Sequence, residues 1–149
     1  TSTILQLIDK KNEGRGNDNR HPLLKISIAE EVHRHLNAET ISLETILKKG
    51  EKIYLRKNSN LSTGGDSIDV TDEIPAFYKD VAVKAAQSAG LKIAGIDIII
   101  TDSAVAPSPE NYIVVELNAP AMLSMHNFPY IGKNRHVEKY VLDSILNSK

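Results

Sequence analysis

The chain has 149 residues, which is enough for one domain, or a large part of one, with a buried core. Its 18 basic and 19 acidic residues nearly cancel, so charge gives no general case for binding nucleic acid or an anionic membrane. No apolar run approaches the roughly 20 residues of a membrane span, and no signal-peptide pattern is seen. The lack of cysteine excludes disulfides and thiolate metal sites, and it agrees with a reducing cytoplasm.

The N-terminal residues predict a helix followed by a polar linker. Thr3-Ile-Leu-Gln6 has the form of a capping box, so a helix is expected over about residues 3–11. The glycine-bearing segment 12–20 has the composition of an exposed linker. Because the sequence enters apolar periodicity directly after Thr1, it is expected to be a piece of a longer protein.

The next segment predicts two short helices and a strand. Ser27-Ile-Ala-Glu30 forms a second capping box, which would open a helix towards Leu36. Residues 42–48 predict another short helix, with Gly50 just beyond it, where glycine is favoured. Residues 51–56 alternate between two faces, a pattern typical of a strand.

The stretch 55–72 concentrates small, polar and flexible residues between two patterned segments. Its candidate binding residues are Asn60, Ser62, Thr63, Gly64 and Gly65. A glycine pair lets the backbone adopt positive φ and turn its N–H groups towards one point, as in an anion-binding loop. Arg56 precedes the loop and can grip a phosphate or carboxylate with two nitrogens. From residue types alone, a solvated turn is an equally good interpretation.

The second half of the chain predicts a helix packed on an antiparallel pair of strands. Residues 75–89 carry an apolar stripe at helical spacing, with proline at the start and Gly90 as the stop. Residues 93–101 and 112–118 alternate as two strands, and the loop between them contains two prolines. Residues 137–145 predict a final amphipathic helix.

Three oxygen-bearing side chains are predicted to lie on one face of these strands. Asp97 stands in an apolar run, where an unpartnered carboxylate would be costly to bury. Glu116 and Asn118 are two residues apart, so on a strand they point to the same side. Mg²⁺ commonly takes one or two carboxylates together with phosphate oxygens and water. The pattern therefore allows a metal site, and the alternative that these residues only mark strand ends stays open at this point.

Longer motifs connect these observations to a family. The run Arg56-Lys-Asn-Ser-Asn-Leu-Ser-Thr-Gly-Gly-Asp-Ser-Ile-Asp-Val-Thr-Asp72 resembles a signature of the ATP-grasp ligases of the glutathione synthetase and cyanophycin synthetase kind. The strand motifs Gly95-Ile-Asp-Ile-Ile-Ile and Val114-Val-Glu-Leu-Asn118 are similar to the metal-binding core of that fold. Residues 125–135 resemble the tail of the bacterial bifunctional glutamate–cysteine ligases/glutathione synthetases.

The resemblance implies an α+β fold, the C-terminal subdomain of the ATP-grasp fold, in which a mainly antiparallel sheet packs with helices. Residues 1–149 would then form the C-terminal portion of an ATP-grasp domain, without the N-terminal half of the module and its adenine pocket. The resemblance implies that Asp97, Glu116 and Asn118 hold Mg²⁺ or Mn²⁺ against the phosphates of ATP. It also implies that Asn118 and Arg56 contact the nucleotide. The residues expected to act in catalysis are Arg56, Asn60, Ser62, Thr63, Gly64 and Gly65.

The implied activity is ATP-dependent ligation of a carboxylate to an amine through an acylphosphate. The motifs favour glutathione synthesis from γ-glutamylcysteine and glycine in the cytoplasm. The expected partners are ATP, a peptide or amino-acid carboxylate, an amine acceptor and the N-terminal remainder of the same enzyme. Nucleic acid and membrane are not expected as partners, and homo-oligomerisation stays open. The alternatives are a cyanophycin synthetase-like ligase for an amino-acid polymer and a non-catalytic binding module.

Overall fold

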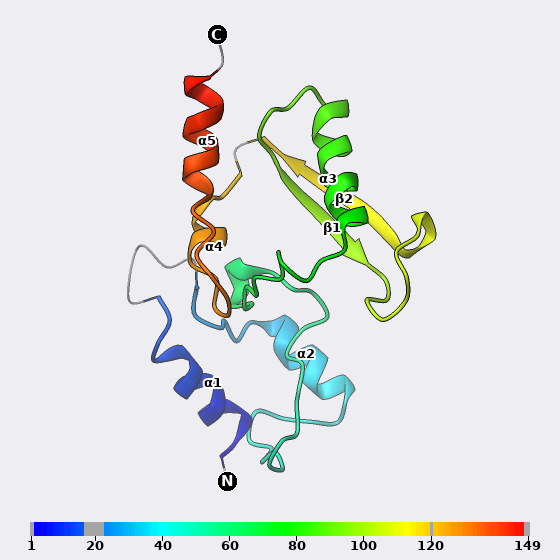
Figure 1. Ribbon diagram of the computed structural model, residues 1–149. Coiled ribbons are helices and arrows are strands. Elements are labelled where there is room, and N and C mark those ends of the chain that lie inside the picture. The colour runs from blue at the N-terminus through cyan, green and yellow to red at the C-terminus, as the bar shows by residue number, and fades with distance from the viewer. Residues whose placement is uncertain (1, 17–22, 120, 148–149) are drawn as a thin grey trace. The chain divides into compact units, whose positions relative to one another are not determined.

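The computed structural model describes residues 2–16, 23–119 and 121–147 (Figure 1). The chain divides into two compact units. Unit 1 comprises Thr1–Ile68 and Phe128–Ile131, and unit 2 comprises Asp69–Asn127 and Gly132–Lys149. In the part of the chain that the structure describes, no helix is both long and apolar enough to cross a membrane.

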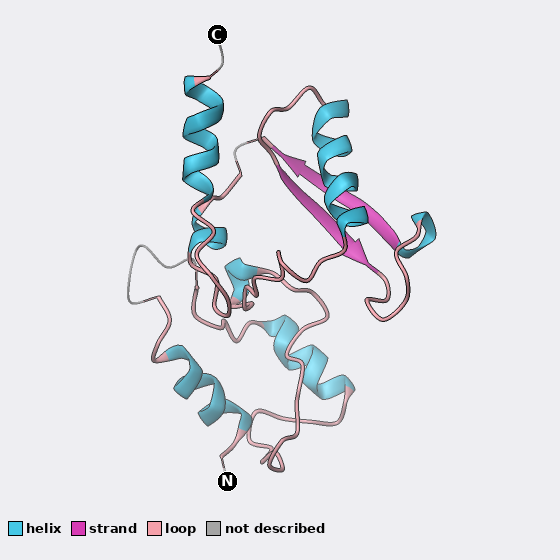
Figure 2. Ribbon diagram, viewed as in Figure 1, coloured by secondary structure: helices cyan, strands magenta, loops and turns pink. Residues whose placement is uncertain are grey.

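Unit 1 places two helices, α1 (Ile4–Asn12) and α2 (Glu30–Ala38), around one apolar core (Figures 1 and 2). The capping box predicted at Thr3 is confirmed. The Thr3 N–H donates to the Gln6 side chain at 3.0 Å, and the Gln6 N–H donates to Thr3 Oγ1 at 3.2 Å. Each helix buries an apolar pair spaced by four residues, because such residues lie on the same helical face. The buried core residues are Ile4, Ile8, Val32, Leu36 and Leu43.

The second predicted capping box does not form. Helix α2 begins at Glu30 with Ala29 in the N-cap position and no side-chain cap hydrogen bond. Residues 23–29 carry no helix, and the carbonyl of Ser27 accepts a hydrogen bond from the guanidinium of Arg56. This contact with a residue further along the chain holds Ser27 outside the helix, so the local capping signal is overridden.

The helix predicted over residues 42–48 is also wrong. The carbonyls of Leu43 and Thr45 accept hydrogen bonds from the N–H groups of Leu5 at 2.9 Å and Ile4 at 3.0 Å. The first N–H groups of a helix have no partner within the helix. The segment therefore caps α1 from outside, and its carbonyls are not used for a helix of its own.

Residues 51–56 do not form the predicted strand, although their alternation is as expected. Ile53 and Leu55 pack against the core, whereas Tyr54 is 76% exposed. Among the described residues this segment has no neighbouring strand to pair with. The predicted exposed linker over residues 12–20 is wrong at Arg15, which is buried because its guanidinium has protein partners. Residues 17–20 of that linker lie outside the described residues.

Unit 2 contains the predicted helix and strand pair. Helix α3 (Ala76–Ser88) packs against β1 (Gly95–Ile100) and β2 (Tyr112–Asn118), which form a two-stranded antiparallel sheet (Figure 2). Pro75 occupies the N-cap position of α3, and Gly90 follows its end with a φ of +69°. The expected antiparallel sheet therefore consists of these two strands within the described residues.

Aromatic residues join α3 to the sheet. The rings of Phe77, Tyr78 and Tyr112 meet edge to face, with centroids 5.4 to 6.0 Å apart. Tyr78 is the most buried residue of α3, and its hydroxyl accepts a hydrogen bond of 3.2 Å from Asn111 Nδ2. Asn111 also holds the backbone of Asp102 through bonds of 2.9 and 2.8 Å. The buried amide thus fixes the connection between the strands.

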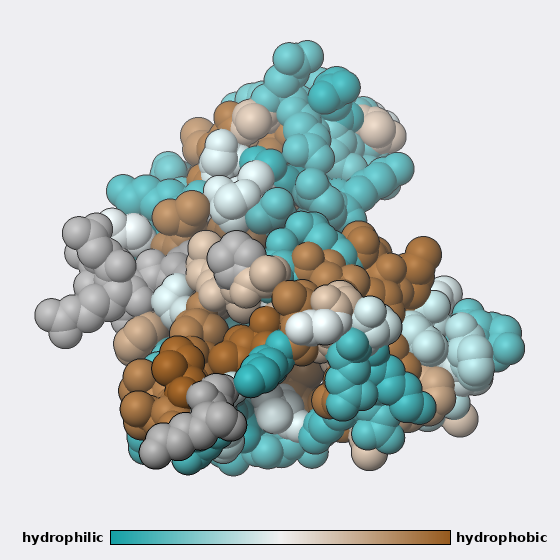
Figure 3. All heavy atoms as spheres, turned by 90° about the horizontal axis from the view of Figure 1, so that it is seen from above, coloured by the Kyte–Doolittle hydropathy of each residue, from teal (hydrophilic) through white to brown (hydrophobic). Residues whose placement is uncertain are grey.

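The remainder of unit 2 contains the short helix α4 (Ser124–Asn127) and the predicted helix α5 (Val137–Leu146). The side-chain oxygen of Asn127 accepts a hydrogen bond of 3.0 Å from the N–H of Val137, at the start of α5. Much hydrophobic surface remains open, as the brown areas of Figure 3 illustrate. On α5 the exposed large hydrophobic residues are Tyr140, Leu142, Ile145 and Leu146.

Candidate functional site

The sheet of unit 2 has one face covered by α3 and one open face. On β1, Ile96, Ile98 and Ile100 are half-buried, whereas Asp97 and Ile99 are exposed. The predicted alternation of this strand is therefore confirmed. Because the side chains of a strand alternate between faces, Asp97 lies on the open face.

A β-bulge shapes this open face. Asp97 is paired with Glu116, and Gly95 with Asn118, but the next pair joins Ile98 to Val114. The skipped residue of β2 shifts its alternation by one position. Glu116 and Asn118 lie on the Asp97 side of the bulge and share the open face with Asp97 through direct strand pairing, while the bulge returns Val114 to the side of α3.

The three residues fit a magnesium site by their chemistry. Asp97 and Glu116 offer exposed carboxylates, and the half-buried Asn118 offers an amide oxygen. Two carboxylates facing each other across a strand pair repel, and a bound cation relieves this repulsion. Within the described residues there is no group of three or more His, Cys, Asp and Glu that could hold a metal ion. Asn118 would add a third oxygen ligand to the two carboxylates, and Mg²⁺ would complete its shell with phosphate oxygens and water.

The loop around the glycine pair belongs to unit 1 and is organised by Asn60. A single 3₁₀ turn, η1 (Leu61–Thr63), follows Asn60, whose side-chain oxygen accepts bonds from the N–H of Ser62 at 3.0 Å and from its hydroxyl at 2.8 Å. The Asn60 carbonyl accepts from the N–H groups of Thr63 at 3.2 Å and Gly65 at 3.0 Å. The expected cradle of free N–H groups is thus not formed, because these donors are used within the turn. We call residues 60–66 the Gly-Gly loop.

Gly64 is required by this loop for two reasons. Its φ is +98°, in the left-handed region that favours glycine. A Cβ at this position would lie 2.4 Å from the Cα of Ile26, which is too close for any side chain. The N–H of Gly64 donates to the Leu61 carbonyl at 3.1 Å, so the turn closes tightly against Ile26.

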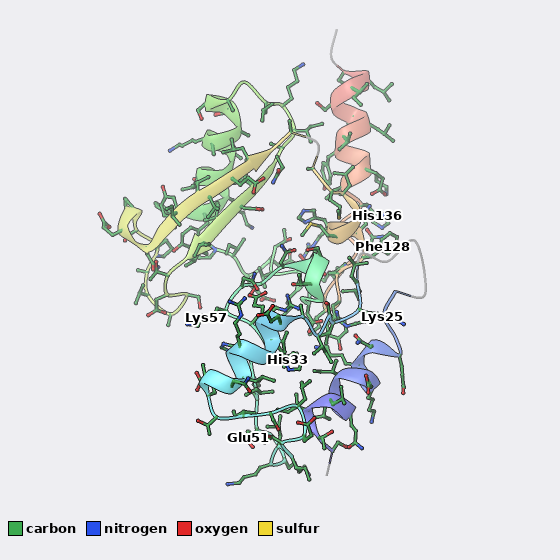
Figure 4. All side chains as sticks on the ribbon, turned by 180° about the vertical axis from the view of Figure 1, so that it is seen from behind. Lys25, His33, Glu51, Lys57, Phe128 and His136 are labelled. Atoms are coloured by element: carbon green, nitrogen blue, oxygen red, sulfur yellow. The ribbon has the colours of Figure 1, made fainter. Side chains whose placement is uncertain are left out.

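Arg56 is held by other residues of unit 1. Its guanidinium donates to the carbonyl of Ser27 and pairs with Glu31 at 3.3 Å, and its side chain is only 9% exposed. Arg56 also lines an open pocket together with its exposed neighbour Lys57, which is labelled in Figure 4. Arg56 therefore also makes structural contacts with Ser27 and Glu31, which the sequence did not indicate.

A cluster of charged residues in unit 2 was missed by sequence reasoning. The Arg135 guanidinium bonds Asp69 at 2.7 Å through Nε and bonds Asp72 through two further nitrogens, each at 2.9 Å. Lys133 Nζ pairs with Asp72 at 2.9 Å. Hydrogen bonds from Arg135 hold the pKa of both carboxyls well below its usual range. Smaller contributions in the same direction come from Thr71 at Asp69 and from Lys133 at Asp72. We call Asp69, Asp72, Lys133 and Arg135 the Asp-Arg clamp.

The Asp-Arg clamp joins two motifs that are far apart in the sequence, residues 56–72 and residues 125–135. Both aspartates belong to the first resemblance motif and Arg135 to the last, 63 to 66 residues away. Gly132 permits the close approach, since its φ is +119° and a Cβ there would lie 2.5 Å from Asp69 Cβ. The opposite charges of the two motifs were the only available signal, and charge alone does not identify a partner at that separation.

The comparison with known families agrees with the geometry of the sheet. Residues 37–141 match the model of the RimK-like ATP-grasp domain. The match covers more than half of the chain and includes Asp97, Glu116 and Asn118, as well as the Gly-Gly loop. The chain belongs to the RimK-like ATP-grasp family.

Two relatives and one solved structure show which members of the family the chain resembles. The chain is 43% identical over 147 residues to the glutathione biosynthesis bifunctional protein GshAB of Desulfotalea psychrophila, and 42% identical over 148 residues to that of Clostridium perfringens. These alignments cover 97% and 98% of this chain but 19% of each relative. The crystal structure of a bifunctional glutathione synthetase from Pasteurella multocida superimposes with a TM-score of 0.81 at 36% identity. The superposition covers 99% of this chain and 20% of the Pasteurella multocida chain. The chain therefore spans about a fifth of the length of the relatives that it matches.

Proposed function

We propose that this chain is part of an ATP-dependent carboxylate–amine ligase that makes glutathione from γ-glutamylcysteine and glycine. The observation that carries the proposal is the shared open face of Asp97, Glu116 and Asn118 within a RimK-like ATP-grasp domain. Identities of 43% and 42% to proteins named for glutathione biosynthesis favour this product over an amino-acid polymer.

The ligation consists of two transfers. The terminal phosphoryl group of ATP passes to an oxygen of the substrate carboxylate, which gives an acylphosphate and ADP. The amine of the second substrate then attacks the acyl carbon, phosphate leaves with the bonding electrons, and the nitrogen loses a proton. Such chemistry depends on positioning and charge neutralisation, so a protein nucleophile is not required.

We assign the open face of the sheet to the metal-bound phosphates. The carboxylates of Asp97 and Glu116 and the amide oxygen of Asn118 would hold Mg²⁺ or Mn²⁺ there. When bound, the cation neutralises charge on the transferring phosphoryl group. The exposure of both carboxylates leaves them accessible to a ligand, and the strand pairing keeps them together.

We assign substrate binding in unit 1 to the Gly-Gly loop and Arg56. The N–H groups of Ser62, Thr63, Gly64 and Gly65 already have partners in the turn, so contacts to a substrate would fall to side chains and to the remaining backbone groups. The hydroxyl of Ser62 and the amide of Asn60 belong to exposed residues. Arg56 would contribute positive charge from the pocket that it lines.

We further propose that residues 1–149 form the C-terminal portion of the ATP-grasp module in a cytoplasmic enzyme. The chain corresponds to 19% of the curated relatives that it matches, which supports the existence of further parts. The N-terminal half of the module, supplied by the same enzyme, would complete the adenine pocket.

The test is a ligase assay on the full-length protein with ATP, Mg²⁺, γ-glutamylcysteine and glycine. We expect glutathione, ADP and phosphate in equal amounts, and we expect Glu116→Gln to lower kcat by about 100-fold or more because it removes a metal-binding charge. Glu73→Gln, at an exposed position outside the open face, is the matched control. Glutathione synthesis at a normal rate by Glu116→Gln at saturating Mg²⁺ would exclude the metal assignment. Turnover of amino-acid polymers instead of glycine would exclude the proposed product.

A further inference from the structure

Arg15 is a buried cation that the proposed chemistry does not use. Its side chain is only 2% exposed, although it follows α1 in a segment whose composition predicted an exposed linker. A charged group removed from water is costly unless it is paired and hydrogen-bonded. The position of Arg15 therefore requires specific partners, and two of them, Gly64 and Asp66, lie in the Gly-Gly loop.

The guanidinium of Arg15 holds the Gly-Gly loop at two points. Its NH1 nitrogen donates to the carbonyl of Gly64 at 2.9 Å and to that of Leu24 at 3.1 Å, and its NH2 nitrogen pairs with Asp66. Lys11 Nζ also pairs with Asp66 at 2.6 Å. Both cations come from α1 or the turn directly after it, so one helix end anchors a loop about 50 residues further along the chain.

One peptide unit of the loop is held at both of its ends. The carbonyl of Gly64 accepts from Arg15, and the N–H of Gly65 donates to the carbonyl of Asn60 at 3.0 Å. Glycine places few steric limits on backbone rotation, so a peptide between two glycines rotates readily when it has no partners. Arg15 therefore selects one orientation of the Gly64–Gly65 peptide.

The surroundings of Arg15 support the same anchor. Asn12, on the last turn of α1, forms two hydrogen bonds with the backbone of Ile26, at 2.7 and 3.1 Å. Gly64 packs directly against Ile26. The ring of Tyr130 lies 5.5 Å from the Arg15 guanidinium, and the Tyr130 N–H donates to the carbonyl of Ser67 at 2.9 Å. The base of the loop is thus fixed from α1, while Ser62 at its outer side is exposed.

We infer that Arg15 is a positioning residue that holds the Gly-Gly loop in its substrate-binding conformation. The role of the loop in substrate binding rests on the proposed function. The anchoring of the loop by Arg15 rests only on the contacts within unit 1. Arg15 acts through the Gly64–Gly65 peptide and Asp66, and it is not expected to touch the reacting atoms.

The test combines hydrogen exchange with kinetics in the full-length protein. Arg15→Lys keeps the charge, but one ammonium cannot occupy the separate positions of the two guanidinium nitrogens. We expect the amides of residues 62–65 to exchange about tenfold faster, with β1 and β2 unchanged, because a local opening is favoured. We expect the KM of at least one of ATP, γ-glutamylcysteine and glycine to rise about tenfold, with kcat changed less. Arg34→Lys, at an exposed position on α2, is the matched control.

The outcomes separate this inference from the proposed function. Unchanged exchange in residues 62–65 would overturn the anchoring role, and faster exchange with unchanged KM values would reduce Arg15 to a structural residue. If the wild-type protein makes no glutathione, the proposed function fails, and the exchange measurement still decides whether Arg15 anchors the loop. If Arg15→Lys fails to fold, Asp66→Asn removes one contact and leaves the guanidinium in place. The same local increase in exchange is then expected.

Discussion

Arg135 and Asp72 face each other through two parallel hydrogen bonds of 2.9 Å, although they are 63 residues apart. A guanidinium and a carboxylate often pair in this two-pronged geometry, which adds directional specificity to the attraction between their charges. The same arginine reaches Asp69, whose side chain is only 7% exposed. Within unit 2, the Asp-Arg clamp therefore fixes the start of the unit to the segment that precedes α5.

The clamp makes stability depend on pH in the acid range. Both aspartates have a pKa held below the usual value in the folded protein, and in the unfolded chain it returns to about 3.9. Their contribution is therefore complete above that value and is lost as the pH falls below it, when the unfolded state binds protons first. We expect the thermal unfolding midpoint to decrease as the pH is lowered from about 5 to about 2. The decrease should be less steep in Arg135→Gln, because this variant lacks the guanidinium that lowers the pKa of both aspartates.

Thermal unfolding of the full-length protein across this range measures the effect. Arg34→Gln changes an exposed arginine of α2 and should keep the wild-type pH profile. Parallel profiles for Arg135→Gln and the wild type would show that the clamp contributes nothing to acid sensitivity.

Two glycines with similar φ offer a matched comparison of strain and packing. Gly64 has a φ of +98°, and a Cβ would lie 2.4 Å from the Ile26 Cα, whereas Gly50 has a φ of +85° with nothing within 4 Å. Backbone strain at positive φ costs roughly 1 to 2 kcal/mol. Overpacking adds roughly 1 to 3 kcal/mol. Denaturant titration should therefore show about 1 kcal/mol lost in Gly50→Ala and about 3 kcal/mol or more in Gly64→Ala. Equal losses would mean that the loop moves away from Ile26 without cost.

The sequence predicted well where the determining contacts are local. Helix α3 and strands β1 and β2 follow from apolar periodicity between Pro75 and Asn118. The common face of Asp97 and Glu116 follows from the period of two in strands, once the strands pair. Even the bulge leaves this prediction intact, because it lies beyond Glu116.

The sequence failed where distant residues decide the local structure. Residues 42–48 carry a helical pattern, but their carbonyls cap α1 at Ile4 and Leu5. Arg15 looks solvent-exposed from its neighbours, and its burial depends on Asp66, 51 residues later. No local pattern encodes which partner a charged or capping group finds. The Asp-Arg clamp was not predicted for the same reason, since Arg135 is 63 to 66 residues from its two aspartates.

Arg56 tests whether a residue from the signature motif is structural, functional or both. A role for Arg56 only in gripping a phosphate or carboxylate, as its place before the loop predicts, implies that Arg56→Ala weakens substrate binding and leaves stability unchanged. The bonds from Arg56 to Ser27 and Glu31 instead predict a loss of roughly 1 to 2 kcal/mol, since the Ser27 carbonyl and the Glu31 carboxylate lose a charged donor. Lys57→Ala, at the exposed neighbouring position, should change stability little. Unfolding curves and KM values measured on both variants separate the roles. A raised KM with unchanged stability would restore the purely functional assignment.

The last prediction concerns residues 1–149 produced alone. Asp97 and Glu116 are exposed on the open face of the sheet, where Mg²⁺ would have two carboxylates and the amide of Asn118 but no phosphate oxygens from the chain. Because Mg²⁺ relies on substrate phosphates for part of its shell, its affinity for these residues alone should be weak. The proposed N-terminal half of the module would supply the adenine pocket, so the isolated chain should also lack tight nucleotide binding. We expect isothermal titration calorimetry to show no micromolar binding of ATP with Mg²⁺ to residues 1–149, and clear binding to the full-length protein. Circular dichroism on the same sample confirms that the chain is folded during the titration. Micromolar binding by residues 1–149 would show that the nucleotide site is complete within this chain and would refute the proposed division of the module.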